Sequence, residues 1–181
     1  MAAFDDFSAL LLEEAKRFLE KIKESKDEDA KKAYKHSAVL IGISALEAYI
    51  NGISQELVNF PTTPIHEKAL LEEKEVELKN GEFIVTERLK IQRLTDRIQY
   101  LYFKHSKTYL TGESEAWWGP LKQSLKVRNG LVHPKEEISI SQDDVEILLK
   151  SVIECLLRLS KIIYKKEYPF RNMGLQSRLT F

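Results

Sequence analysis

The chain has 181 residues, of which 43% are hydrophobic and 31% are charged, which predicts one folded, helix-rich domain and excludes a disordered or fibrous chain. Its 28 basic and 28 acidic residues balance, so only local clusters of charge, and not the net charge, can indicate a nucleic-acid partner. The single cysteine, Cys155, excludes an internal disulfide framework and favours a reducing cytosol.

Neither a secretory leader nor a membrane span is expected. The first six residues are acidic, whereas a leader begins with basic residues. The longest apolar run, residues 38–43, is far too short to cross a bilayer. We therefore expect a soluble, cytoplasmic protein with no membrane partner.

Two long helices are predicted in the first third of the chain. Apolar side chains recur at spacings of three and four from Phe4 to Ile22, as on one face of an amphipathic helix. The next helix should cover residues 29–59. Its middle, residues 37–54, is apolar nearly all the way round and is expected to be the central, buried helix. The prolines within residues 60–64 end it.

The central third is predicted to hold two shorter helices. Residues 66–79 form a charged helix, for which Asn80 and Gly81 provide a C-cap. Another helix starts near Thr86, carries apolar side chains on one face, and gives way to a loop over residues 104–115.

Two further helices complete the prediction. Pro120 in a first-turn position opens a helix that ends at Val132 or His133, because Pro134 disfavours the α conformation in the residue before it. A last helix covers residues 141–164, and its opening Ser-Gln-Asp-Asp resembles a capping box with Asp in place of Glu.

No convincing strand appears in the sequence, so the predicted fold class is all-α, a bundle of about five to six helices. We expect a single domain over residues 1–167. A basic C-terminal tail follows over residues 168–181, with Arg171 and Arg178 and no acidic residue.

Few motifs for catalysis or cofactor binding occur. There is no Cys/His set with zinc spacing and no glycine-rich phosphate loop, so neither a metal nor a cofactor is expected. His36, His66 and His105 have no partner pattern and are expected to be surface or helix-end residues. The adjacent Trp117 and Trp118 are expected to anchor a loop on the core.

Residues 120–135 contain four cations and no acid. On a helical wheel, Lys122, Lys126, Asn129 and His133 share a stripe about 60° wide, and an apolar stripe lies beside it. Arg128 falls next to the apolar stripe and not with the other cations. The helix should therefore have a basic, polar edge that ends in a histidine, and one arginine directed partly toward the core.

Such an arginine needs an anion, because an unpaired buried charge is costly. Glu47 is the one formally charged residue between Lys35 and Glu56, and its neighbours are strongly apolar. We therefore expect Glu47 to pair with Arg128. The pair would either link two helices structurally or position catalytic groups, and the sequence alone leaves both open.

The segment from Arg128 to His133, Arg-Asn-Gly-Leu-Val-His, resembles the Arg-x4-6-His motif of the HEPN superfamily, whose ribonuclease members commonly have a polar residue just after the arginine. The resemblance implies a HEPN-like helical bundle that dimerises so that two motifs face one cleft. His133 would then act as general acid or base on RNA, because an imidazole titrates near neutrality. Arg128 would hold the scissile phosphate, Asn129 would orient the phosphate or the histidine, and Lys122 and Lys126 would follow the RNA backbone.

The resemblance thus predicts a metal-independent endoribonuclease that works as a homodimer, in the role of a toxin or an antiviral-defence effector. An antitoxin or regulatory protein is a possible partner. The alternative is a non-catalytic HEPN-like module that only dimerises or docks a partner, and a generic helical scaffold is a third interpretation. RNA cleavage that persists in chelator and disappears in His133→Ala would separate the enzyme from the other two.

Overall fold

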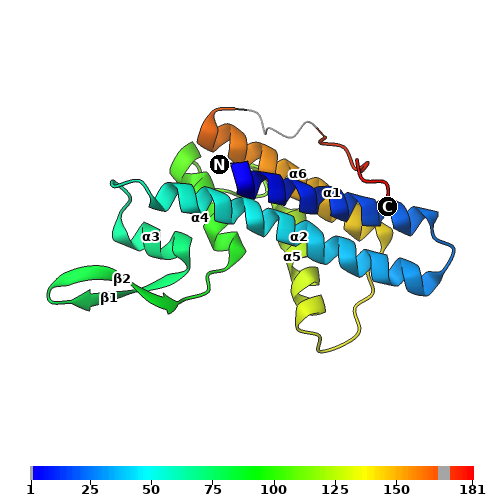
Figure 1. Cartoon of the computed structure of the whole chain (residues 1–181), viewed down its shortest axis with the longest axis horizontal. Helices are drawn as coiled ribbons and strands as arrows, with labels where there is room; N and C mark the ends of the chain where they lie inside the picture. The colour runs from blue at the N-terminus through cyan, green and yellow to red at the C-terminus, as the bar shows by residue number, and fades with distance from the viewer. Residues whose placement is uncertain (1, 167–171) are drawn as a thin grey trace.

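The computed structural model describes residues 2–166 and 172–181, and the arrangement is shown in Figure 1. Within these residues the chain forms six helices and one two-stranded sheet. In chain order these are α1 (Ala2–Glu24), α2 (Glu28–Val58), α3 (Ile65–Glu72), β1 (Lys74–Lys79), β2 (Glu82–Leu89), α4 (Leu94–Ser106), α5 (Trp118–Val132) and α6 (Gln142–Tyr164). The fold is therefore helical, as predicted, but it is not purely all-α.

The predicted central helix is confirmed. α2 is buried along most of residues 38–54, and it contacts α1, α5 and α6. The Asp27 carboxylate caps its start by accepting a hydrogen bond from the Asp29 N–H at 3.0 Å. Helices α2 and α6 pack so closely at Gly42 that an added Cβ there would lie 2.9 Å from the Leu148 side chain of α6. A larger side chain at that position would push α2 and α6 apart.

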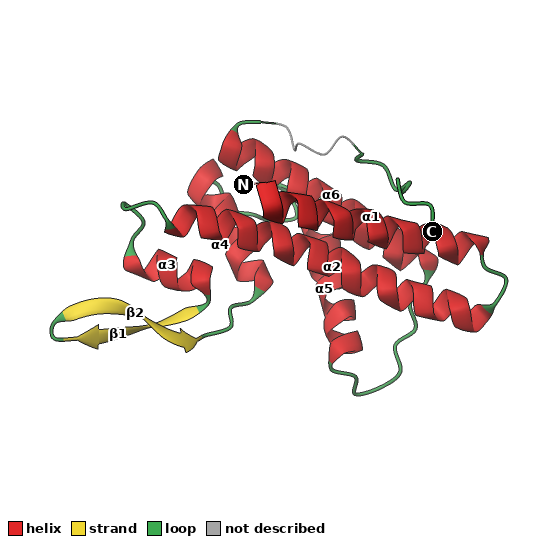
Figure 2. Ribbon diagram, viewed as in Figure 1, coloured by secondary structure: helices red, strands yellow, loops and turns green. Residues whose placement is uncertain are grey.

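The segment predicted as one helix over residues 66–79 is a short helix followed by a strand. α3 stops at Glu72, and β1 and β2 form an antiparallel hairpin that projects from the helical body in Figure 2. Asn80 and Gly81 both have positive φ, at 52° and 86°, so they form the hairpin turn and not a helix C-cap. An Asn-Gly dipeptide suits both a helix C-cap and a hairpin turn, which is why the helical prediction was wrong.

Because β2 occupies the residues around Thr86, the next helix begins at Leu94 and not near Thr86. Cross-strand pairing places Val76 opposite Val85 and Leu78 opposite Phe83, so these apolar side chains share one face of the hairpin. Three of the four, Val76, Leu78 and Phe83, are exposed. The alternation of apolar and polar residues in β1 was the signal for a strand.

The predicted ends of the last two helices are confirmed. α5 ends at Val132 with His133 as its C-cap, although it begins at Trp118, two residues before Pro120. Ser141 and Asp144 form the expected capping box at the start of α6. Trp117 and Trp118 are both buried, as expected for a pair that anchors a loop on the core.

The C-terminal residues that the structure describes lie along α1. Lys16 is fully buried there, and its ammonium group donates to the main-chain oxygen of Asn172 at 2.7 Å. The Ser177 hydroxyl donates to the Glu13 carbonyl at 2.8 Å, and the Arg178 N–H donates to the Glu13 carboxylate. Arg171 of the predicted basic tail, and the side chain of Phe4 at the other end, lie outside the described residues.

One helix, α2, is long and apolar enough to cross a membrane by length and composition alone. Just over half of its most apolar stretch is buried inside the fold. This is weak evidence for a span, because the core helix of a soluble protein has the same properties.

Candidate functional site

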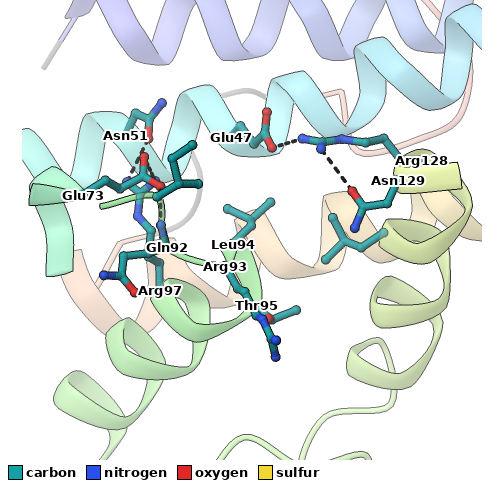
Figure 3. Close-up of a pocket in the computed structure, with 12 residues that line it drawn as sticks. Glu47, Asn51, Glu73, Gln92, Arg93, Leu94, Thr95, Arg97, Arg128 and Asn129 are labelled. Atoms are coloured by element: carbon teal, nitrogen blue, oxygen red, sulfur yellow. Dashed lines mark hydrogen bonds and ion pairs between the residues drawn. The ribbon is translucent and has the colours of Figure 1, made fainter. Parts of the chain in front are cut away.

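A cleft of about 570 Å³ lies between α2, α4 and α5, and Figure 3 shows the side chains that line it. α2 contributes Glu47 and Asn51, and α5 contributes Arg128 and Asn129. The start of α4 and the segment before it complete the wall. The sequence separates these elements by dozens of residues, so only the packing of the bundle brings their polar groups together.

The predicted pair between Glu47 and Arg128 is present. Arg128 Nη2 donates to Glu47 Oε1, and Arg128 Nη1 donates to Asn129 Oδ1 at 3.1 Å (Figure 3). The pair is less buried than expected, because the Glu47 side chain is 37% exposed and that of Arg128 is 23% exposed. The face of α2 that carries Glu47 borders the open cleft. Solvent therefore screens this pair more than a core ion pair.

The basic edge of α5 is also present. Lys122, Lys126, Asn129 and His133 are all exposed, as the helical wheel predicts for one stripe. The Lys122 ammonium lies 5.5 Å from the centre of the Trp118 ring, a cation–π distance.

His133 does not line the cleft that holds Arg128 and Asn129. It follows the last turn of α5, where its N–H donates to the Asn129 carbonyl at 2.9 Å. Its backbone has left the helical conformation, with φ −126° and ψ 65°, because Pro134 follows it. The structure thus brings Glu47, Arg128 and Asn129 into one cleft and leaves the histidine exposed at the helix end.

Gly130, in the middle of the motif, has a packing role. The loop after α5 folds back so that Ile138 lies against Gly130, where a Cβ would collide with the end of the Ile138 side chain. A glycine weakens a helix by about 1 kcal/mol relative to alanine. Here it allows the loop to approach α5 closely.

A second apolar side of α5 carries Val127 and Leu131 and is partly covered by the chain itself. Val127 and Leu131 are half-buried and pack against the core. Val127 also lines a smaller hollow of about 260 Å³ beside Ile147 of α6. These two residues therefore provide no separate argument for a dimer.

Arg97 lies at the other end of the cleft, and the sequence analysis did not predict it as a site residue. It is 4% exposed, and its guanidinium donates to Asn51 Oδ1 at 2.8 Å, to Ser54 Oγ at 2.9 Å and to Glu73 Oε2 at 3.2 Å. Burial lowers the pKa of Arg97 from its ordinary value, although Glu73 and Glu47 oppose that shift. The available signal was its position beside Ile98, on the apolar face of the helix.

Glu73 joins Arg97 to the entrance of the cleft. It is the C-cap of α3 in the left-handed conformation, with φ 55°, and its second carboxylate oxygen accepts from the Gln92 N–H at 3.0 Å. Arg93, beside Gln92, is exposed and makes no side-chain hydrogen bond or ion pair within the part of the chain that the structure describes. Arg93 therefore has a guanidinium available to an anion.

The cleft combines an apolar floor with charged ends. Leu94 lies between the Arg128 pair and the Arg97 network (Figure 3), and Leu125 also lines the cleft. Three arginines and two glutamates border it, so it suits an anionic ligand with an apolar part. Across residues 2–166 and 172–181, no three His, Cys, Asp or Glu side chains are grouped so that they could hold a metal ion.

Comparison of the chain with protein-family models, with curated protein sequences and with solved structures found no match.

Proposed function

We propose that this chain is a metal-independent endoribonuclease of the HEPN type, acting in the cytoplasm as a toxin or an antiviral-defence effector. The observation that supports it most is the placement of the motif. Arg128 and Asn129 face a polar cleft, and His133 follows on the same helix with its side chain exposed. Lys122 and Lys126 continue the same exposed edge, where an RNA backbone would be attracted.

In the proposed reaction, His133 removes the proton from a ribose 2′-hydroxyl. The 2′-oxygen then attacks the adjacent phosphorus, and the bond from phosphorus to the 5′-oxygen breaks. The products are a 2′,3′-cyclic phosphate and a 5′-hydroxyl, once the leaving oxygen has taken up a proton. Arg128 stabilises the charge that develops on the phosphate oxygens, which a planar guanidinium does well.

Glu47 and Asn129 position Arg128 in this proposal. Both contact its guanidinium in the free protein, so substrate phosphate must share the arginine with the Glu47 carboxylate. A half-exposed pair can be rearranged at lower cost than a buried one. The pair would therefore hold Arg128 at the cleft without preventing it from binding a phosphate.

We propose a homodimer because His133 lies outside the cleft that holds Arg128. In a two-fold dimer with α5 near the interface, His133 of the partner subunit would act on a phosphate that Arg128 holds. An antitoxin or regulatory protein would bind over the same surface and block it.

The decisive test is an assay on labelled RNA in the presence of chelator. Wild-type protein should cut RNA, leave 2′,3′-cyclic phosphate ends, and spare DNA, which lacks the 2′-hydroxyl. His133→Ala should lose at least the 10²- to 10⁴-fold, roughly, that positioned acid–base catalysis contributes. Arg128→Ala should lose a comparable amount. Lys126→Ala should mostly weaken binding and reduce its salt dependence.

His66→Ala is the matched control, because His66 is an exposed histidine on α3 that does not line the cleft. It should cut RNA like wild type. If folded His133→Ala cuts equally well, the activity belongs to another site or to a contaminant, and the assignment of His133 fails.

Mixing two inactive variants tests whether the site is shared between subunits. If Arg128 of one chain and His133 of the other form one site, a mixed dimer of His133→Ala and Arg128→Ala contains one intact site. Random exchange makes half of the dimers mixed, so activity should return to about a quarter of the wild-type value. Sedimentation should show the dimer at micromolar concentration. A monomer, or no recovery after verified exchange, would contradict the shared site.

The alternative function is a non-catalytic docking module of the same type. The position of His133 outside the cleft favours it, as does the pairing of Arg128 with Glu47 in the free protein. Such a module would bind an anionic partner at the cleft and cut no RNA in the assay above.

A further inference from the structure

Two aromatic rings are stacked on the surface at the C-terminal end of α4, at the opposite end of that helix from the cleft. Phe103 and Tyr109 have ring centroids 5.1 Å apart and ring planes 22° apart. Phe103 is 43% exposed and Tyr109 is 77% exposed. Aromatic side chains that anchor a loop are buried, as Trp117 and Trp118 are in this protein. The exposed pair therefore has no such packing role.

Lysines gather at the same end of the molecule, where α4 and α6 finish side by side (Figure 1). Lys107 and Lys165 are the C-caps of these helices, and both are exposed in the left-handed conformation. Burial lowers the pKa of His105, and three lysines lower it further, namely Lys104, Lys165 and Lys107 in that order. Three ammonium groups therefore lie within electrostatic range of one imidazole.

These lysines differ in how far they are neutralised. Lys104 donates to the Glu67 carboxylate, which offsets its charge. The ammonium groups of Lys107 and Lys165 make no hydrogen bond or ion pair within the described part of the chain. A cation at a helix C-terminus interacts favourably with the helix dipole. This explains why lysines occupy the two C-cap positions, but it does not explain the exposed rings of Phe103 and Tyr109.

We propose that Phe103, Tyr109, Lys107 and Lys165 form a contact surface for single-stranded RNA, named here the aromatic–lysine patch. The choice of RNA rests on the ribonuclease function proposed above. An unpaired base would stack on the outer face of the Tyr109 ring, and the flanking phosphates would meet the ammonium groups of Lys107 and Lys165. This combination of stacking rings and cations binds single strands with little sequence preference.

The patch and the cleft lie at opposite ends of α4, whose 13 residues span about 20 Å. A single strand of several nucleotides can cover that distance. The patch would therefore hold the RNA away from the point of cleavage and raise its affinity without taking part in the chemistry.

The test is binding of a labelled single-stranded RNA, measured by fluorescence anisotropy in chelator with His133→Ala as the parent, so that no cutting interferes. Adding Tyr109→Ala should raise the Kd about 5- to 100-fold, as expected for the loss of one stacked base. Adding Lys107→Gln and Lys165→Gln should weaken binding and flatten its dependence on salt.

Matched controls lie elsewhere on the surface. Phe60→Ala removes an exposed ring in the turn after α2, and Lys79→Gln with Lys90→Gln removes two exposed lysines of the hairpin region. These should leave RNA binding unchanged. Circular dichroism should show native helix content for every variant, which is expected because the altered side chains are exposed.

The outcomes separate this proposal from the ribonuclease proposal. If the wild type cuts RNA but Tyr109→Ala leaves RNA binding unchanged, the proposal of the aromatic–lysine patch is overturned and the ribonuclease proposal is supported. If RNA binds through Tyr109 and the wild type cuts none of it, the patch stands and the ribonuclease fails. Absence of RNA binding, or binding of phosphatidylserine vesicles in its place, also overturns the patch.

Discussion

At the scale of single residues, the two arginines of the cleft differ in how far water reaches them. Arg97 is 4% exposed and donates several hydrogen bonds to protein groups, whereas Arg128 is 23% exposed beside a carboxylate that is itself 37% exposed. Removing one partner of an ion pair costs more when the pair is buried, because the groups left behind are unpaired away from water. The sequence suggested the opposite order, since it singled out Arg128 as the buried cation.

Alanine substitutions should therefore separate the two. Arg97→Ala should lower the free energy of unfolding by about 3–5 kcal/mol, because it removes a buried cation from an ordered network. Arg128→Ala and Glu47→Ala should each lower it by only about 1 kcal/mol, as for partly screened pairs. Urea unfolding measures this, with the exposed hairpin residue changed in Arg88→Ala as the neutral control. Equal losses for Arg97→Ala and Arg128→Ala would contradict the difference in burial.

At the scale of secondary-structure elements, the hairpin depends on its turn. Asn80 and Gly81 both adopt left-handed conformations, and such a turn matches the twist of the two strands. An isolated two-stranded hairpin is only marginally stable, and among the described helices α3 makes most of the contacts with β1 and β2. Local strain in the turn should therefore loosen the hairpin before it affects the helices.

Gly81→Ala tests this. A Cβ at φ 86° costs roughly 1–2 kcal/mol, although nothing lies within 4 Å of it. Amide exchange should accelerate over β1 and β2 and stay unchanged in the buried parts of α2 and α6. Gly112→Ala is the control, because Gly112 also has open space but no positive φ. Uniform acceleration through the whole domain would mean that the hairpin is part of the main cooperative unit.

At the scale of the whole molecule, the ends of the chain support one another. The described C-terminal residues follow α1 and cover Lys16, so a cation in the first helix is buried by residues more than 150 positions away. Asn172 and Ser177 provide the side-chain hydrogen bonds to Glu13 that hold this segment.

Removing both side chains should release the segment. A net contribution of about 1 kcal/mol for each hydrogen bond predicts that Asn172→Ala with Ser177→Ala raises the open population about tenfold or more. Tryptic cleavage after Arg178 should accelerate accordingly, at low protease concentration. Ser139→Ala, an exposed loop serine, is the control and should not change the rate. Unchanged cleavage would show that apolar contacts such as that between Phe18 and Phe181 hold the segment instead.

The sequence by itself determined the elements whose signals are local. The apolar stretch of α2, the end of α5 before Pro134 and the capping box of α6 all follow from neighbouring residues, and each appears where it was predicted. The contact between Glu47 and Arg128 was also predictable, because an isolated charge in an apolar helix needs a partner.

Only the tertiary structure decided which meaning an ambiguous signal took and how much solvent each group retained. Asn80 and Gly81 suit both a helix cap and a hairpin turn, and the choice depends on whether a second strand is present to pair with β1. Arg97 lies on an apolar helical face, but its anion comes from Glu73, 24 positions earlier. The exposure of Glu47 and the separation of His133 from the cleft depend on how the helices pack against one another and which of their surfaces remain exposed. No local pattern in the sequence encodes that property, because it is set by the relative placement of α2, α4 and α5.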